Sequence, residues 1–168
     1  MNKSNYTKES FTELYEKYYE QVLRICRAYV NGDVESAKDL TQDVFSRVWE
    51  NLESFNENSK ISTWIYRIAV NTCLLYKRKS KPDVRSYKVF TKDEGRGHEL
   101  YELRMKKMFE AINKLPDRNK SIILLELESV PQKEIAEIMG MTHSAVSCLL
   151  YTSPSPRDQR GSRMPSSA

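Results

Sequence analysis

The sequence is poor in the features that mark secreted, membrane and disulfide-rich proteins. Its three cysteines, Cys26, Cys73 and Cys148, are an odd number, are widely spaced and form no Cys-x-x-Cys pair. Cys26 and Cys73 fall on apolar helix faces, so we expect them to be reduced core residues. The polar N-terminus lacks the apolar stretch of a signal peptide, and no apolar run is long enough to span a bilayer. We therefore expect a cytoplasmic protein that does not insert into a membrane.

Patterns that carry catalytic chemistry are also missing. The two histidines, His98 and His143, have no cysteine or carboxylate set at metal-ligand spacing. The sequence contains no phosphate-binding glycine loop and no nucleophile elbow. We therefore predict no catalytic residue, no metal site, no cofactor and no small-molecule substrate, and we do not expect an enzyme.

Charge is distributed unevenly along the chain, although the net charge of +4 is mild. Basic residues cluster in 76–88, whereas residues 33–57 are rich in acids. Because bulk charge alone does not argue for a nucleic-acid partner, local clusters have to carry any such argument. Apolar residues make up 39% of the 168, which suffices for a core, but for a thin one if the chain divides into two domains.

Apolar residues recur at helical spacing over three stretches of the N-terminal half, at 11–29, 34–52 and about 60–78. Gly32 suits a left-handed helix end and Asp33 suits a helix N-cap, so the first two helices should meet there. Inward positions of the third helix are predicted to be Ile61, Trp64 or Ile65, Ile68 and Leu75. Three helices of this length form a self-sufficient bundle, which we place at residues 8–80.

Helical periodicity disappears over residues 81–98, where prolines, glycines and mixed charges predict a flexible linker. A second helical group follows over 99–150, and Pro116 and Pro131 suit the first positions of two of its helices. The first helix of this group should use one apolar face, made of Tyr101, Met105, Met108, Ile112 and Leu115. The predicted fold is all-α, with two small helical domains joined by the linker.

The end of the second group has the spacing of a helix-turn-helix. Ala136 is small enough for two helices to cross closely, Gly140 accepts the positive φ of the turn, and Val146 packs the second helix. Thr142 can cap that helix. Its N-terminal side chains would face base edges in the major groove, which gives as candidates His143, Ser144 and Ser147, with Gln132 near a phosphate. An ordinary helical hairpin is the alternative, and the register of Ala136, Gly140 and Val146 favours DNA binding.

The third helix joins aromatic residues to a basic end. Trp64 and Tyr66 can stack on unpaired bases, and Asn71 can hydrogen-bond an exposed base edge. Phosphates would be neutralised by Lys77, Arg78, Lys79 and Lys81, a salt-sensitive contribution that carries no sequence information. Considered alone, Trp64 is more simply a core residue, and the basic run is equally a solvated helix end.

The second helix presents an acidic face. Asp39, Gln42 and Asp43 stand at positions i, i+3 and i+4, on or near one side of the helix. Such a pattern, taken alone, is more often a solvated surface than a binding site, and only a known partner surface would change that interpretation.

Together these segments resemble the bacterial sigma-70 family, and within it the small two-domain extracytoplasmic-function (ECF) group. The similarity covers roughly residues 8–147 and rests on three motifs in the family's order: DLTQDVF, then STWIYRIAVNT ending in KRK, then LPDRNKSIILL with EIAEIMGMTHSAV. The resemblance implies a cytoplasmic sigma factor that binds core RNA polymerase, recognises −10 and −35 elements of promoter DNA and stabilises melted DNA. It also implies an anti-sigma factor as a partner.

The family's roles transfer to matching positions of this chain, with residues 8–80 as region 2 and 99–150 as region 4. The acidic helix implies polymerase contacts at Asp39, Gln42, Asp43, Phe45 and Trp49. The third helix and the loop before it imply −10 contacts at Phe55, Trp64, Asn71, Lys77, Arg78 and Lys79. The helix-turn-helix implies −35 contacts at Gln132, His143, Ser144 and Ser147.

The sequence departs from the family's pattern after Val146. The family continues its recognition helix with a basic stretch, whereas this chain reads SCLLYTSPSP, whose prolines cannot continue a helix. We expect a recognition helix of about two turns and, over 151–168, a disordered, non-native tail from adapter read-through. Two alternatives stay open: a stand-alone helix-turn-helix transcriptional regulator, and a polymerase-binding module that has lost −35 recognition.

Overall fold

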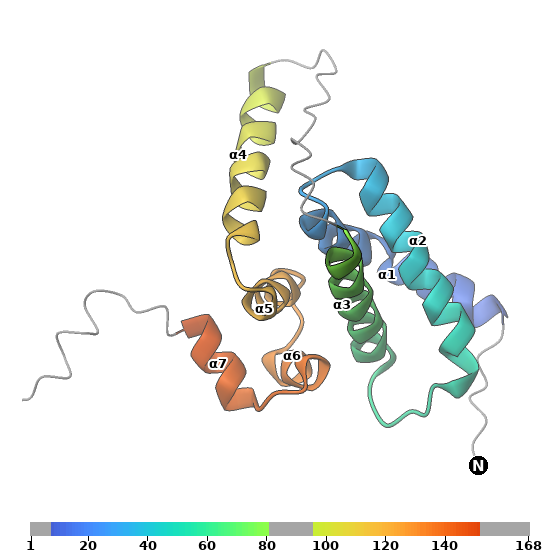
Figure 1. Cartoon of the computed structure of the whole chain (residues 1–168). Helices are drawn as coiled ribbons and strands as arrows, with labels where there is room; N and C mark the ends of the chain where they lie inside the picture. Colours follow the sequence, from blue (N-terminus) through green and yellow to red (C-terminus); the bar gives the residue numbers. More distant parts are fainter. Residues whose placement is uncertain (1–7, 81–95, 152–168) are drawn as a thin grey trace, which may run out of the picture.

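The computed structural model describes residues 8–80 and 96–151, and over these ranges its regular structure is entirely helical (Figure 1). Within these two ranges seven α-helices and one short 3-10 turn follow one another, which confirms the all-α prediction. Most of the predicted linker and nearly all of the predicted tail lie at 81–95 and 152–168, outside the described residues.

The first three helices are α1 (Lys8–Tyr29), α2 (Val34–Asn51) and α3 (Ile61–Lys79), with the 3-10 turn η1 (Leu52–Ser54) after α2. The turn between α1 and α2 follows the prediction, because Gly32 takes a φ of 84° and the Asp33 carboxylate accepts a hydrogen bond from the Ser36 amide at 3.1 Å. Asn31 also adopts a left-handed φ of 55°, which asparagine tolerates better than most residues.

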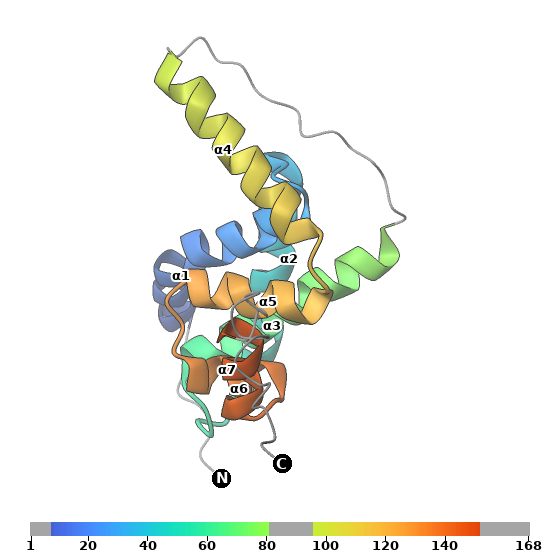
Figure 2. The ribbon, with the colours of Figure 1, turned by 90° about the vertical axis from the view of Figure 1, so that its left-hand side faces the viewer.

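The predicted stripes of α1 and α2 form the core of this group together with α3. Fully buried aliphatic residues from all three helices meet there, namely Val22, Ile25, Val44, Val48 and Ile65. Each such side chain contributes about 1.5–3 kcal/mol by leaving water. The inward prediction for Leu75 is wrong, because this side chain remains 38% exposed near the C-terminal end of α3. That end projects from the rest of the molecule in Figure 2.

The second group contains α4 (Arg96–Asn113), α5 (Asp117–Leu127), α6 (Gln132–Met139) and α7 (His143–Tyr151). Helix α4 begins at Arg96, so the last three positions of the range predicted as linker are helical. Pro116 and Pro131 are N-caps, not first helical residues, so α5 and α6 each begin one position later than predicted.

The predicted apolar face of α4 is only partly correct. Ile112 is buried together with Phe109, which the prediction did not include, whereas Tyr101 and Met108 are 55% and 37% exposed. The N-terminal half of α4 extends away from the other helices (Figure 2), so its side chains have little to pack against.

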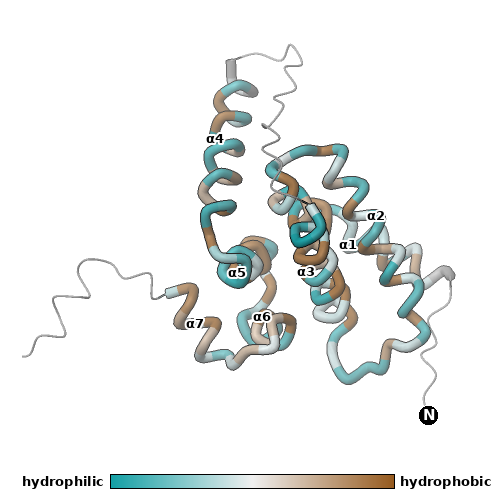
Figure 3. The backbone as a smooth tube through the Cα atoms, in the orientation of Figure 1, coloured by the Kyte–Doolittle hydropathy of each residue, from teal (hydrophilic) through white to brown (hydrophobic). Residues whose placement is uncertain are grey.

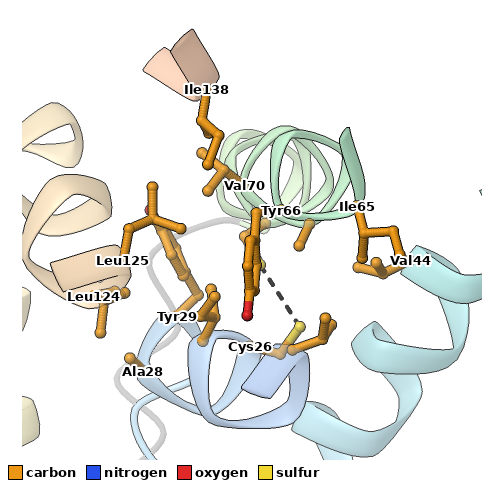
Figure 4. Close-up of a cluster of buried hydrophobic side chains, with 14 of the residues drawn as sticks. Cys26, Ala28, Tyr29, Val44, Ile65, Tyr66, Val70, Leu124, Leu125 and Ile138 are labelled. Carbon is orange, nitrogen blue, oxygen red and sulfur yellow. Dashed lines mark hydrogen bonds between the residues drawn. The ribbon is translucent and has the colours of Figure 1, made fainter. Parts of the chain in front are cut away.

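The two helical groups pack against each other. Helices α4 and α5 contact α1, and α6 contacts α3. Buried side chains of both groups form one continuous cluster, in which Leu125 and Ile138 of the second group approach Tyr29, Tyr66 and Val70 of the first (Figure 4). The apolar side of α5 is turned toward α3, as the colouring in Figure 3 shows.

Candidate functional site

Helix α2 exposes the acidic face that the sequence predicted. Asp39, Gln42 and Asp43 are all exposed, because the buried positions of the helix, among them Leu40 and Val44, point toward α1 and α3. In Figure 1, α3 lies between α2 and the helices α5, α6 and α7. This face is therefore open to a partner.

An aromatic cluster borders the acidic face and contains two of the predicted polymerase contacts, Phe45 and Trp49. The Trp49 side chain is 44% exposed and meets the ring of Phe11 edge-on, with 5.0 Å between the ring centroids. Phe45, by contrast, is only 2% exposed, and its ring lies 4.7 Å from that of Tyr15. The contact of Phe45 with polymerase stays a prediction, and in this structure the ring is turned into the core. Phe45 instead fixes α2 on α1.

Two aromatic residues predicted to meet single-stranded DNA are buried. Phe55 is 5% exposed and supports the partly buried Trp64, with 5.1 Å between their ring centroids. Tyr66 is also 5% exposed and packs edge-on against Tyr18 of α1. Burial, assisted by the charge of Glu128, raises the pKa of Tyr66 to about 12. Direct stacking of Phe55 or Tyr66 on bases is thus not supported, whereas Trp64 lies at the surface boundary.

The polar candidates of α3 are exposed. Asn71, Lys77, Arg78 and Lys79 all lie at the surface, and Lys77 is ion-paired with Asp117 at the start of α5. Asn71 stands seven positions after Trp64, which is two helical turns, so the two side chains share one face of α3.

Two further residues on that face were missed by the sequence predictions. Lys60, the N-cap of α3, and Arg67 stand four positions before and three positions after Trp64, so they lie beside it on the same side of the helix, whereas Thr63 is the adjacent residue and is buried. Together with Trp64 and Asn71 the two cations form a surface that we call the α3 face. The sequence contained a pattern that could have identified the two basic residues, because Lys60 and Arg67 are seven positions apart and stand on either side of Trp64.

Helix α6 lies against the α3 face. The carboxylate of Glu134 pairs with the Lys60 ammonium and accepts a hydrogen bond of 3.1 Å from the Thr63 hydroxyl. The Arg67 guanidinium donates to the Glu137 carbonyl oxygen at 3.0 Å and lies 3.7 Å from its carboxylate. Side chains of the helix-turn-helix thus hold two cations of α3.

A second set of contacts joins α1 to α4 and α5. Arg24 donates two parallel hydrogen bonds to Glu128, at 2.8 and 2.7 Å. The hydroxyl groups of Tyr29 and Ser121 form a buried hydrogen bond of 2.6 Å. The Lys120 ammonium lies 4.3 Å from the centre of the Tyr29 ring and donates to the Asn113 side chain. Burial, with a smaller effect of the nearby Lys77 charge, lowers the pKa of Lys120 to about 8.

The turn between α6 and α7 has the geometry of a helix-turn-helix. Gly140 takes a φ of 63°, which confirms its predicted role at the end of α6. Val146 is fully buried and Ala136 is 5% exposed, so the predicted packing positions also agree. The Thr142 hydroxyl accepts a hydrogen bond of 3.2 Å from the Ala145 amide and thereby caps α7, as predicted.

The structure brings two of the four −35 candidates together. The Ser147 hydroxyl donates to the Gln132 side-chain oxygen at 3.0 Å, and the Gln132 amide nitrogen donates to the Tyr151 hydroxyl at the same distance. His143 and Ser144 are exposed at the start of α7. A contact of Gln132 or Ser147 with DNA would therefore have to replace or share a hydrogen bond within the motif.

Three further observations on the described residues concern the state of the cysteines, possible metal ligands and possible membrane-spanning helices. Cys26 and Cys73 are buried, free and 3.7 Å apart between their sulfur atoms, whereas Cys148 is exposed. In ranges 8–80 and 96–151, the structure has no group of three histidine, cysteine or carboxylate side chains that could hold a metal ion. No helix in those ranges combines the length and apolar character that crossing a membrane requires.

Comparisons with known proteins agree with this arrangement. The family described as Sigma-70 region 2 matches residues 14–82, and the family described as Sigma-70, region 4 matches residues 106–151. The RNA polymerase sigma factor YlaC of Bacillus subtilis is 30% identical over 155 residues, which cover 86% of this chain and 87% of the relative.

A second relative and a solved structure extend the comparison. The ECF RNA polymerase sigma-E factor of Haemophilus influenzae is 30% identical over 147 residues, covering 79% of this chain and 77% of the relative. The structure of CnrH in complex with the cytosolic domain of CnrY has the same fold, with a TM-score of 0.65 at 19% identity over 86% of this chain and 82% of that one. The chain therefore belongs to the ECF group of the sigma-70 family, the promoter-directing sigma factors of RNA polymerase.

Proposed function

We propose that this chain binds core RNA polymerase through the exposed face of α2 and carries it to promoters. The observation that carries the proposal is that Asp39, Gln42 and Asp43 stand together on an open surface, with the exposed Trp49 at its edge. Two carboxylates and an amide supply acceptors for cationic and N–H groups of a partner, and the indole supplies apolar contact area.

The opened −10 strand binds to α3 in this proposal. Trp64 stacks on a base, Asn71 hydrogen-bonds a base edge, and Lys77, Arg78 and Lys79 neutralise phosphates. Phe55 contributes by packing its ring against that of Trp64. Unstacking a base costs a few kcal/mol, and contacts with the flipped base offset that cost.

The protein itself makes no covalent bond in this mechanism and is not an enzyme. It selects the start site and stabilises melted DNA while the polymerase carries out the chemistry, so its place of action is the cytoplasm. An anti-sigma factor is a further proposed partner, and the similar CnrH structure, which was solved as a complex, supports an additional protein contact.

The helix-turn-helix of α6 and α7 reads the −35 element as duplex DNA, with His143 and Ser144 nearest the base edges and Gln132 and Ser147 behind them. A second candidate function is a polymerase-binding module without −35 recognition. It is favoured by the composition of α7, because His143–Tyr151 contains no lysine or arginine to contact phosphates. Binding of the chain to −35 duplexes in complex with polymerase separates the two functions.

The decisive experiment is a fluorescence anisotropy titration of the labelled chain with bacterial core RNA polymerase, with Asp43→Arg as the test variant. Asp43→Arg reverses a charge at the centre of the α2 face, and we expect at least a tenfold loss of affinity, or about 1.4 kcal/mol. The matched control is Glu110→Arg, the same reversal at an exposed position of α4.

Equal affinity of the wild type and both variants for polymerase would show that the exposed face of α2 takes no part in the polymerase interface. Absence of binding by a folded wild-type chain would favour the stand-alone helix-turn-helix regulator, which needs no polymerase.

A further inference from the structure

Two cysteines that the proposed function does not use face each other in the core. Cys26 of α1 and Cys73 of α3 have no exposed surface, and their sulfur atoms lie 3.7 Å apart, within hydrogen-bonding distance for sulfur. The dashed line at Cys26 in Figure 4 marks this contact. The fold thus brings together two free thiols that stand 47 positions apart in the chain.

The geometry of the pair is close to that of a disulfide. The sulfur atoms of a disulfide are about 2.05 Å apart, so the two sulfurs have to approach each other by about 1.7 Å. Each thiol stands on its own helix and can turn about its Cα–Cβ bond, and α1 and α3 are already in contact. A bond between the sulfurs therefore requires rotation of two small side chains and no exchange of neighbouring helices.

The two thiols differ in how readily they lose a proton. The hydrogen bond between them lowers the pKa of Cys26, whereas the same bond, together with burial, raises the pKa of Cys73 well above its usual range. The thiolate is the reactive form of cysteine, so Cys26 is the nucleophile of the pair. Cys73 keeps its proton and is placed to react second.

We propose that Cys26 and Cys73 form a reversible oxidation site, at which hydrogen peroxide converts both thiols into a disulfide that joins α1 to α3. In the first step the Cys26 sulfur attacks a peroxide oxygen, the O–O bond breaks, and the products are a Cys26 sulfenic acid and one water. In the second step the Cys73 sulfur attacks the sulfenic sulfur, an S–S bond replaces the S–O bond, and the oxygen leaves with the Cys73 proton as a second water. The two cysteines lose two electrons and two protons, and the peroxide takes up both.

The pair lies near a part of the molecule that a small oxidant can enter. Leu75 and Tyr76, which follow Cys73 closely in α3, are exposed, and the C-terminal end of α3 projects from the other helices (Figure 2). Helix ends open locally at a much lower cost than the whole fold. Opening of this end admits a molecule of the size of hydrogen peroxide, so the pair should react more slowly than the exposed Cys148.

The cross-link lies on the inner side of α3. Cys73 stands nine positions after Trp64, which is two and a half helical turns, so the two side chains point to opposite sides of the helix. The disulfide therefore forms away from the α3 face, and it stops oxidation at a stage that a dithiol reductant reverses. A sulfenic acid without a neighbouring thiol proceeds instead to the sulfinic acid, which such a reductant does not restore. This inference goes beyond the proposed function and does not depend on it.

The test treats the folded chain with hydrogen peroxide and follows its intact mass. The protein carries Cys148→Ser, because an exposed thiol would react by itself and cross-link two chains. We expect the monomer to become lighter by two hydrogen atoms and to lose both thiols together, and dithiothreitol should restore both. The wild-type chain, in which Cys148 reacts, shows that the peroxide is active.

Two matched variants separate a specific pair from independent oxidation. Cys26→Ala and Cys73→Ala, each combined with Cys148→Ser, keep a single thiol and should gain oxygen atoms or remain reduced, without losing hydrogen. Urea unfolding then compares the oxidised and reduced forms of the paired protein. Because a disulfide that fits the native packing restricts the unfolded chain, the midpoint should rise by at least about 0.5 M.

The proposal is overturned if the paired protein gains oxygen atoms in place of losing hydrogen, or if it stays reduced while Cys148 of the wild type is oxidised. It is also overturned if the oxidised form unfolds at a lower urea concentration than the reduced form, since the native packing would then oppose the disulfide. Circular dichroism before and after peroxide verifies that the reaction takes place in the folded chain. Polymerase binding is not part of the test, so its outcome is independent of the proposed function.

Discussion

Helices α2 and α3 belong to the same three-helix group and both carry residues of a family motif, yet the second helical group leaves one open and covers the other. Helix α2 presents Asp39 and Asp43 to solvent, and α3 stands between α2 and α5–α7 (Figure 1). Helix α3 presents Lys60 and Arg67, and these are held by α6.

The difference follows from charge. The covering helix α6 carries Glu134 and Glu137 on the side that meets the first group, so it is attracted by a basic face and repelled by an acidic one. The second helical group therefore lies against the basic residues near the start of α3 and leaves the acidic face of α2 uncovered.

The largest expected effect tests α2, where Phe45 and Trp49 stand one helical turn apart but differ in burial. We expect Phe45→Ala to lower the free energy of unfolding by about 3–4 kcal/mol, since it empties a packed site between α1 and α2. Trp49→Ala should change stability by less than about 1 kcal/mol and should weaken polymerase binding instead. Urea unfolding and polymerase titration of both variants measure the split. If both variants lose the same stability, the distinction between core and surface on α2 is wrong.

The next effect concerns the contact between the two helical groups, at the buried hydrogen bond between Tyr29 of α1 and Ser121 of α5. Ser121→Val leaves the Tyr29 hydroxyl buried without its partner, and we expect a loss of about 2 kcal/mol in urea unfolding. Adding Tyr29→Phe removes both polar groups and should restore most of that loss. Additive losses in the double variant would contradict a specific contact between the two helical groups.

The smallest effect is a pH dependence of stability caused by Lys120. Its pKa is lowered from 10.5 to about 8 by burial, so the unfolded chain binds the Lys120 proton more tightly than the folded one. The free energy of unfolding should therefore rise with pH from about 8 to 9.5, by at most about 1.4 kcal/mol per pH unit. Lys120→Met removes this contribution, so the difference in slope between wild type and variant isolates it from cysteine and tyrosine titration. Parallel curves for the two proteins would show that Lys120 is solvated in the folded state.

Local sequence patterns predicted the helices well because their causes are local. The α1–α2 turn needed a residue that tolerates positive φ and a side chain that caps, and Gly32 and Asp33 supply both. The turn of the helix-turn-helix has the same two requirements, and Gly140 supplies the positive φ while Thr142 supplies the capping side chain. Apolar periodicity likewise identified the buried stripes of α1 and α2, since a helix has one side to bury.

Exposure of individual aromatic residues could not be predicted in the same way. Phe45, Phe55 and Tyr66 all stand in or beside motifs, and their burial depends on rings supplied by distant positions such as Tyr15 and Tyr18. The motif pattern marks the segment that matters, and packing decides which of its side chains reaches a partner.

The sequence by itself determined the helical content, the turns, the acidic face of α2 and the basic end of α3, because each depends on residues within a few positions of one another. Only the tertiary structure decided that Glu134 meets Lys60 and that Tyr29 meets Ser121, across 74 and 92 positions of the chain. Contacts at that separation depend on how whole helices pack, and neither periodicity nor capping encodes them.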